Sequence, residues 1–292
     1  LLSAQVDLSK FDSSYFRAAT EEEKKQQDVM SESTTFFKDG IRRLKKNPLA
    51  MGSLVVLILI LLIIIIAPHI VPYSYDQIIT VNGVRDKSAK NLGMMEYSPR
   101  ELQYMEETGE KLFPHIFGTD SLCRDYFIRV IYGTRVSLAV GLVASIMVLI
   151  IGLLYGAIAG YCGGKVDMVM QRILEIANGI PRLVIVTLLL LVLKPGMLTI
   201  IFALMLTEWV GMSRIARAEM LKLKEQEFVL ASRTLGAGSF FIIFKEILPN
   251  IIGPIITQVM FSIPTAIFTE AFLSFVGLGI PVPQCSLSLI HI

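Results

Sequence analysis

Residues 49–67 read LAMGSLVVLILILLIIIIA, a run of nineteen positions without a charged side chain. An α-helix rises about 1.5 Å per residue, so about 20 apolar residues cross a hydrocarbon core about 30 Å thick. The run is longer than the hydrophobic part of a secretory signal peptide, and no small-residue cleavage site follows it. The segment therefore predicts a membrane-spanning helix.

The composition of the whole chain points the same way. Hydrophobic residues make up 53% of the 292 residues and charged residues 18%, against about 25% charged in an average soluble domain. The net charge of +2 is too small to indicate a nucleic-acid partner. Cys123, Cys162 and Cys285 lie far apart, without the spacing of a metal site. A disordered chain, a fibrous repeat and a disulfide scaffold are excluded, and an all-α integral membrane protein is expected.

Four further stretches are apolar and long enough to cross a bilayer, namely Val136–Gly160, Ile173–Leu193, Met197–Ser213 and Ile251–Phe272. Five spans are therefore expected. The third of the five is interrupted by Asn-Gly-Ile-Pro at 178–181, and the fifth contains two prolines.

Basic side chains give the expected orientation. The first span directly follows Arg42, Arg43, Lys45 and Lys46, and basic residues beside a span favour the cytoplasmic side. The N-terminus is then inside. The expected segments are a cytosolic tail over 1–48, the first span over 49–67, an extracytoplasmic loop over 68–135, and a core over 136–292 that contains a cytoplasmic loop at 214–250.

Three glycines mark one face of the second span. Gly152, Gly156 and Gly160 recur at a spacing of four, which places them on the same side of a helix. Without side chains, this face would let another helix approach closely. Glycine is also frequent in membrane helices, so flexibility or chance is the alternative to helix packing.

The cytoplasmic loop is expected to form two short helices with a corner between them. In the first, over 224–235, Phe228, Ala231 and Leu235 recur at i, i+3 and i+7 and form an apolar face. Gly236 follows as a helix stop. This apolar face either packs on the protein's own spans, lies in the membrane interface, or forms a socket for a cytoplasmic partner.

Capping residues predict where two other helices begin and end. The second cytoplasmic helix is expected over 240–248, capped by Ser239 and ended by Pro249. The helix that leads into the second span is expected to be capped by Thr119 or Asp120. Turns are indicated in the outer loop at Asn82-Gly83 and Ser98-Pro99.

Catalytic constellations are missing from the sequence. It contains no phosphate-binding loop, no HExxH and no GxSxG, and its three histidines are isolated from one another. Glu175, Glu208 and Glu270 fall near the ends of the expected spans. They are either functional intramembrane charges or interfacial salt bridges. The chain is therefore not expected to be an enzyme or to hold a metal or cofactor.

The cytoplasmic loop carries a family signature. Residues 230–250, LASRTLGAGSFFIIFKEILPN, resemble the "EAA" signature of ABC-importer permeases. The positions that match in register are Ala231, Gly236, Leu248 and Pro249, whereas Leu230 stands in for the Glu and Ser232 for the second Ala. The run from Gly118 to Leu138 resembles the GTD-x-x-GRD…R-x-x-YG-x-R-x-SL pattern of peptide permeases, with Cys123 in place of a Gly. The chain thus resembles the C-type second permease of dipeptide, oligopeptide and nickel importers.

This resemblance implies a fold, partners and site residues. It implies an alternating-access half-channel in a bacterial or archaeal cytoplasmic membrane, surrounded by lipid. The implied partners are a homologous second permease, two cytosolic ABC ATPases and an extracytoplasmic substrate-binding protein, and ATP and Mg²⁺ would be bound by the ATPases. The implied ATPase-coupling residues are Phe228, Ala231, Ser232, Leu235, Gly236, Leu248 and Pro249. Dipeptides and longer peptides are the expected substrates, while nickel chelates and sugars stay open.

Two alternatives and one irregularity complete the sequence picture. A secondary carrier with broken helices would fit the interruption at 178–181, but we find no inverted repeat. A membrane enzyme would need the missing site residues.

Related permeases have a sixth span, which the ending at 285–292 does not resemble, so a final helix of about 20 residues is expected to be missing.

Overall fold

The structure, a computed structural model, describes residues 36–280 and 285–287 and divides the chain into two compact units, 1–59 and 60–292. Most of the expected cytosolic tail lies outside the described residues. So do residues 288–292, which belong to the ending from which a missing sixth span is expected. Within them, four helices are long and apolar enough to cross a membrane, and a bent helix pair adds a fifth span. The expected helical membrane fold is confirmed, with four spans, or five when the bent pair is counted as one span.

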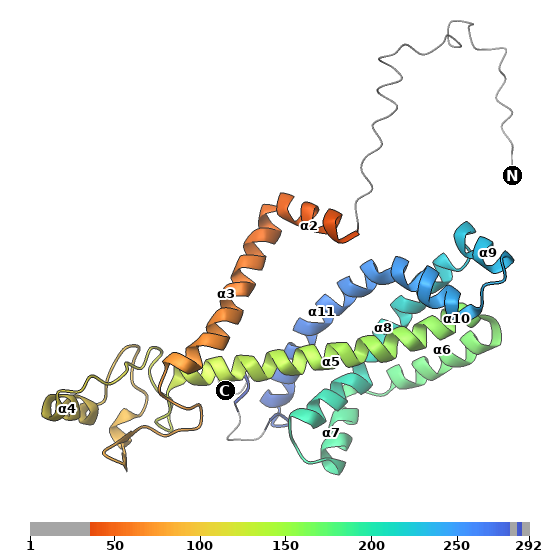
Figure 1. The fold of residues 1–292 in the computed structure, drawn as a ribbon. Helices are drawn as coiled ribbons and strands as arrows, with labels where there is room; N and C mark the ends of the chain where they lie inside the picture. Colours follow the sequence, from red (N-terminus) through yellow and green to blue (C-terminus); the bar gives the residue numbers. More distant parts are fainter. Residues whose placement is uncertain (1–35, 281–284, 288–292) are drawn as a thin grey trace, which may run out of the picture. The chain divides into compact units, whose positions relative to one another are not determined.

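The first unit contains α2 (Phe36–Lys46) and the start of α3 (Pro48–Ile70), which carries the apolar run (Figure 1). Asn47 starts α3, because its Oδ1 accepts the backbone N–H of Leu49 at 3.1 Å and that of Ala50 at 3.3 Å. Only 6% of the most apolar stretch of α3 is buried. Its side chains are therefore available to lipid on almost every side.

Pro68 leaves one backbone carbonyl of α3 without its helical partner, and a side chain of another helix bonds to this carbonyl instead. Pro68 has no N–H to give to the carbonyl of Ile64, which lies four residues earlier. The guanidinium of Arg135 donates to this carbonyl twice instead, at 2.9 and 2.7 Å. The two bonds tie the second half of α3 to the helix that follows residues 71–125.

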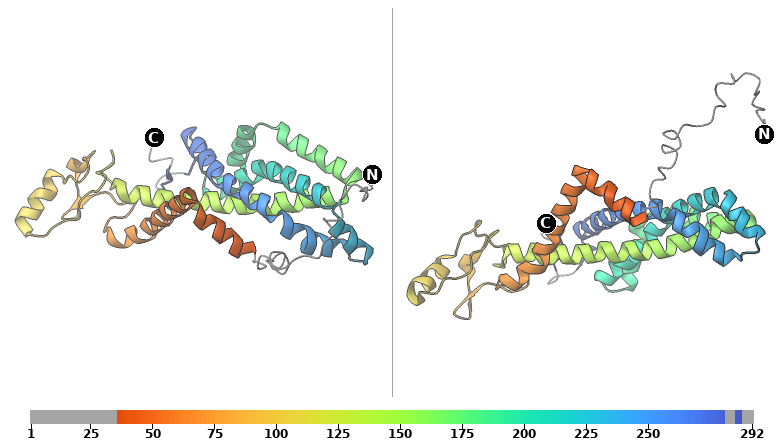
Figure 2. Two further views of the ribbon diagram at one scale, coloured as in Figure 1. Left: turned by 90° about the horizontal axis from the view of Figure 1, so that it is seen from above. Right: turned by 45° about the horizontal axis from the view of Figure 1, so that its top comes forward.

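The second unit is built around α5 (Tyr126–Cys162), along which α8 (Met197–Leu223) and α11 (Leu248–Phe275) pack (Figures 1 and 2). In the sequence, α5 and α8 are connected by α6 (Gly164–Gly179) and α7 (Arg182–Val192), which meet at an angle of 80°. The interruption expected at 178–181 is therefore a sharp break between two half-helices.

The first part of α5 extends well beyond the expected span, and its cap differs from the expected one. Asp125 starts the helix and accepts the N–H of Ile128 at 3.0 Å. Neither Thr119 nor Asp120 caps it, because both side chains hold the preceding loop instead. Asp120 accepts from the backbone of Leu122 and Arg124, each at 2.9 Å, and the Thr119 hydroxyl donates to the Ala89 carbonyl at 2.5 Å.

The helix expected to end at Pro249 runs on. The segment begins as α10 (Ser239–Phe241), continues as the π-helical turn η4 (Ile242–Ile247), and becomes α11 without a gap. Proline lacks an N–H and crowds the carbonyl four residues earlier. The wider π turn, in which the N–H of Leu248 reaches the carbonyl of Ile243, accommodates it. The cap also differs, since Gly238 and not Ser239 stands at the N-cap and no side chain caps the helix.

Residues 71–125 form a small folded region of their own. It contains the hairpin β1 (Thr80–Val81) and β2 (Val84–Arg85), the short helix η3 (Lys87–Ala89), and α4 (Pro99–Thr108). The hairpin turns at Asn82 and Gly83, which have φ of 52° and 73°. Ser98 caps α4 in a reciprocal capping box with Glu101. Both expected turns are confirmed.

Candidate functional site at the cytoplasmic elbow

The elbow, which lies in the loop expected from the sequence to be cytoplasmic, consists of α9 (Glu227–Thr234) and the corner at 235–238. The corner is a Schellman motif, in which Gly236 donates to the carbonyl of Arg233 and Ala237 to that of Ser232, both at 3.0 Å. Gly236 has a φ of 84°, a conformation that a residue with a Cβ adopts only at a cost. The expected helix stop at Gly236 is present.

One side of α9 is fixed to the membrane helices. Val229 is fully buried and belongs to a core cluster with Met220 of α8 and Ile247 of η4. Just before α9, the Lys224 ammonium donates to the carbonyl of Gly160 at 2.9 Å. The guanidinium of Arg233 lies 5.9 Å from the ring centre of Tyr161. Both contacts are to the C-terminal end of α5, so a displacement of α9 acts directly on this helix.

The opposite side of α9 is apolar and uncovered. Phe228 is 39% exposed and Leu235 88% exposed, and the exposed Ala231 lies between them on the same face. Two positions of the expected site are less open, since Ser232 and Leu248 are half-buried, whereas Gly236 and Pro249 are exposed. The structure thus places the helix positions of the site on one outward face, and Leu248 and Pro249 apart from it at the start of α11.

Sequence reasoning missed two parts of this elbow. Val229, its anchor, lies outside the i, i+3, i+7 set. Phe240 and Phe244 extend the uncovered apolar surface, with exposures of 74% and 43% and ring centres 4.3 Å apart. Their i, i+4 spacing is the signal that could have found them. Near Leu248 and Pro249, a cavity of about 340 Å³ has apolar walls that include Leu153 and Phe244.

The three glycines of α5 lie against α8. A Cβ built on Gly152 would lie 2.5 Å from the Met212 Cβ, and one on Gly160 would lie 2.8 Å from the Met220 Cβ. Distances below 3.0 Å mean that neighbouring atoms would have to move. The two helices therefore approach as closely as their backbones allow. Next to this contact, the guanidinium of Arg217 on α8 makes two bonds of 2.5 Å to Asp167 on α6.

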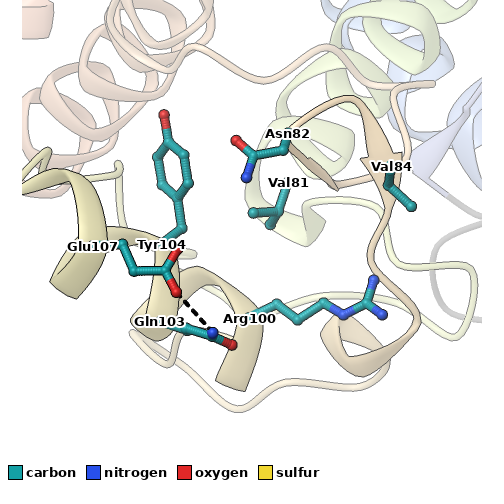
Figure 3. A pocket seen from close by; sticks show the side chains of 7 residues that line it. All are labelled: Val81, Asn82, Val84, Arg100, Gln103, Tyr104 and Glu107. Carbon is teal, nitrogen blue, oxygen red and sulfur yellow. Dashed lines mark hydrogen bonds between the residues drawn. The ribbon is translucent and has the colours of Figure 1, made fainter.

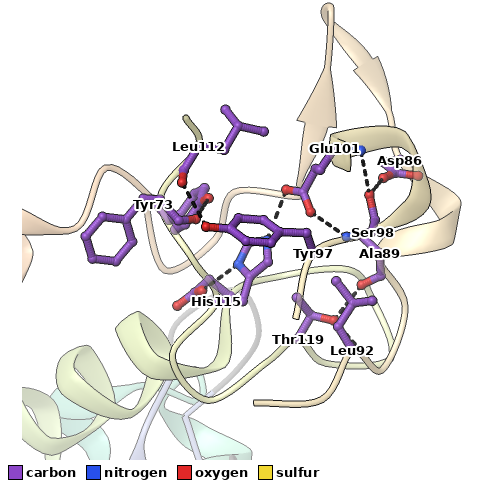
Figure 4. A network of polar contacts seen from close by, with 12 residues as sticks. Tyr73, Asp86, Ala89, Leu92, Tyr97, Ser98, Glu101, Leu112, His115 and Thr119 are labelled. Carbon is purple, nitrogen blue, oxygen red and sulfur yellow. Dashed lines mark hydrogen bonds and ion pairs between the residues drawn. The ribbon is translucent and has the colours of Figure 1, made fainter. Parts of the chain in front are cut away.

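A buried polar network holds the region of residues 71–125 together (Figure 4). His115 is fully buried, with Nδ1 at 2.8 Å from Asp125 and Nε2 at 3.1 Å from Glu101. The ring of Tyr73 stacks on it at 4.9 Å. One imidazole thereby connects the end of α3, the capping box of α4 and the cap of α5. Burial alone would lower the pKa of His115, but its bonds to the two carboxylates raise it to about 9.

We expect this imidazole to make the stability of the protein depend on pH. A pKa raised from 6.5 to about 9 stabilises the folded state fully below pH 6.5, and this stabilisation is lost as the pH rises through 9. It amounts to about 3 kcal/mol, at 1.36 kcal/mol per pKa unit. Thermal unfolding between pH 6 and pH 9.5 should show the fall. His115→Gln should flatten the profile, and an equally steep profile in this variant would contradict the assignment.

A second feature of this region is a pocket of about 330 Å³ between the hairpin and α4 (Figure 3). Its wall carries Asn82 from the hairpin and Arg100, Tyr104 and Glu107 from α4. The Gln103 amide donates to Glu107 at 2.8 Å. The pocket is polar and open to the outside.

Comparison with known proteins gives consistent matches. A family model described as "Binding-protein-dependent transport system inner membrane component" matches residues 152–290, and "N-terminal TM domain of oligopeptide transport permease C" matches residues 35–91. The dipeptide transport system permease protein DppC of Bacillus subtilis is 43% identical over 254 residues, which cover 87% of this chain and 72% of that protein.

One further relative and one solved structure were also found. The oligopeptide transport system permease protein OppC of Bacillus subtilis is 38% identical over 255 residues, which cover 87% of this chain and 76% of that protein. A solved structure of the MetNI methionine ABC transporter in an inward-facing conformation aligns with 52% of this chain and 76% of that chain, at 19% identity and a TM-score of 0.48.

Proposed function

Because the chain belongs to the family of binding-protein-dependent transport inner membrane components, as a permease of the DppC and OppC type, we propose that it forms one half of a peptide pathway opened by ATPases at the elbow. It is a multi-pass inner-membrane permease subunit of a dipeptide or oligopeptide ABC transport system, and not the ATPase. This membership decides against the secondary carrier that the broken span also suggested.

The observation that carries the proposed coupling role is the two-sided packing of α9. Val229 is buried in the protein's own core, while Phe228, Ala231 and Leu235 face outward. An apolar helix face of this kind on a polar loop is stable only when a partner covers it. We assign that partner to the cytosolic ATPase, which would bind ATP and Mg²⁺.

Movement of the elbow would reach the membrane by two routes. Lys224 and Arg233 contact the end of α5, and the corner leads into the unbroken helical segment 239–275. When the ATPases close, α9 would therefore tilt α5 and α11 together. A homologous second permease would supply the other half of the pathway, and an extracytoplasmic binding protein would deliver the peptide. The basic residues before α3 support an N-terminus on the cytoplasmic side.

Replacing Ala231 by Arg tests this role. The longer charged side chain would have to enter a face that the ATPase covers, and burying an unpaired charge is costly. We expect peptide-stimulated ATP hydrolysis and uptake to fall about tenfold or more in vesicles that contain all subunits. The matched control is Gln226→Arg, with the same charge change at the exposed N-cap position directly before α9. Unchanged activity of Ala231→Arg, with normal assembly, would refute the assignment.

A further inference from the structure

An ion pair lies deep within the membrane part of the chain. The guanidinium Nη1 of Arg182 contacts Oε1 of Glu208 at 2.5 Å. Glu208 is the twelfth residue of α8, which begins at Met197, and eleven steps of about 1.5 Å place it about 17 Å from that end. This is about the middle of a hydrocarbon core of about 30 Å. Glu208, which the sequence places near the end of its expected span, lies in the interior of the longer helix α8, which continues to Leu223.

The broken span brings Arg182 to the same depth. The residue is the first of α7, directly after the 80° bend, and α6 before it rises about 24 Å over its 16 residues. Its side chain is nevertheless 59% exposed, and that of Glu208 is 19% exposed. An exposed charge in the middle of the bilayer is too costly to face lipid. This side of α7 and α8 must therefore face a water-filled path or protein.

A cavity of about 390 Å³ opens beside the pair. Arg182 belongs to its lining, together with the hydroxyl-bearing Thr207 and Thr269 and the aromatic Phe268 and Phe272. Phe268 is 76% exposed. The threonine hydroxyls donate to their own helices, as Thr269 does to the carbonyl of Thr265 at 2.8 Å. Their oxygens remain available as acceptors toward the cavity.

The charges of this site match those of a free peptide. A peptide carries an ammonium group at one end and a carboxylate at the other near neutral pH. Arg182 offers a forked donor for the carboxylate, Glu208 an acceptor for the ammonium, and the cavity apolar walls for side chains of varied kind. In the resting chain each charge is neutralised by the other, so the site is stable when no peptide is present.

We propose that Arg182 and Glu208 recognise the two termini of a peptide on its way through the membrane, a proposal that rests on the transport function above. The peptide replaces one ion pair by two, Arg182 with the carboxylate and Glu208 with the ammonium. Because the internal pair must open first, the net gain is small. Binding is then favourable enough for entry and weak enough for release.

Blocking the peptide termini tests this exchange. The complete transporter is reconstituted with its binding protein, and initial uptake is compared for trialanine, N-acetyl-trialanine and trialanine amide. In Arg182→Gln we expect the preference for trialanine over its amide to fall about tenfold relative to the wild type. In Glu208→Gln the preference over the acetylated peptide should fall instead. The binding protein is the same throughout, so a changed ratio arises in this chain.

A matched control and a charge swap separate recognition from cohesion. Arg172→Gln removes a 2.5 Å ion pair with Glu175 on the surface of α6 and should leave all ratios unchanged. The proposal is refuted if both test variants lower the uptake rates of the three peptides equally. It is also refuted if the double variant Arg182→Glu with Glu208→Arg restores wild-type uptake rates and ratios. In either case the ion pair serves only to hold the helices together.

The remaining outcomes are also decisive. If Arg182→Gln does not assemble, Arg182→Lys keeps the charge without the forked donor, and it should show a smaller loss of preference for the free carboxylate; an unchanged preference would count against the site. If the wild-type transporter imports none of the peptides, the transport function itself fails. If it imports them and no variant changes a ratio, only terminus recognition fails.

Discussion

Replacing Gly156 by Ala is expected to lower the free energy of unfolding by about 3 kcal/mol, the upper end for overpacking a tight contact. The new methyl group would lie 2.7 Å from the Ala216 Cβ and 2.9 Å from the backbone nitrogen of Arg217, and closer still to the carbonyl of Ser213. Two of these three atoms belong to the α8 backbone, which cannot turn aside as a side chain can. The helices would have to separate along their whole contact.

The measurement is unfolding of the purified protein in mixed micelles by increasing amounts of denaturing detergent. Gly253→Ala on α11 is the control, because a Cβ there meets nothing within 4 Å. It should stabilise the helix by roughly 0.5–1 kcal/mol. Equal stability of the two variants would show that the α5–α8 contact is looser than described.

Replacing Gly118 by Ala should have an effect of similar size in the extracytoplasmic region. Gly118 has a φ of 76°, which costs a residue with a Cβ about 1–2 kcal/mol. The Cβ would also lie 2.7 Å from the carbonyl oxygen of Gly93 and closer to that of Leu92. Strain and backbone clash together should destabilise the region by about 4 kcal/mol.

Gly83→Ala separates the two causes. Gly83 has almost the same backbone conformation, with a φ of 73°, but a Cβ there meets nothing within 4 Å. Only the strain of about 1–2 kcal/mol should remain. Rates of proteolysis within residues 71–125 of the intact protein would show the difference, and indistinguishable rates for the two variants would contradict the packing at Gly118.

The membrane spans could be predicted from the sequence, because a helix surrounded by lipid needs a long run of apolar side chains. The ends of the helices could not be predicted. The run at 49–67 needs only apolar side chains, and α3 meets that need almost without tertiary contacts. The helix α8 instead continues past Ser213 through polar residues, where Arg217 is held by Asp167 of another helix. Bonds between distant parts of the chain, rather than local preference, decide such ends.

The candidate site, too, could be predicted only in part. Spacing alone predicts the outward face of α9 and the glycine face of α5, because both follow from helix periodicity. It does not predict which helix the glycines meet, nor that the isolated His115 lies between Glu101 and Asp125. The pairing of Arg182 with Glu208 depends on the bend between α6 and α7, and the sequence around Pro181 indicates a break but not its angle.

The helix α5 has a mechanical consequence for both ends of the protein. It runs for 37 residues as one α-helix, so it is about 55 Å long, and it contains no proline to kink it. Its outer end is held by the His115 network through Asp125, and its inner end by Lys224 through Gly160. A long helix without a kink transmits a force from one end to the other. A push at its C-terminal end would therefore tilt its N-terminal end in the same stroke, and no separate relay is needed between them.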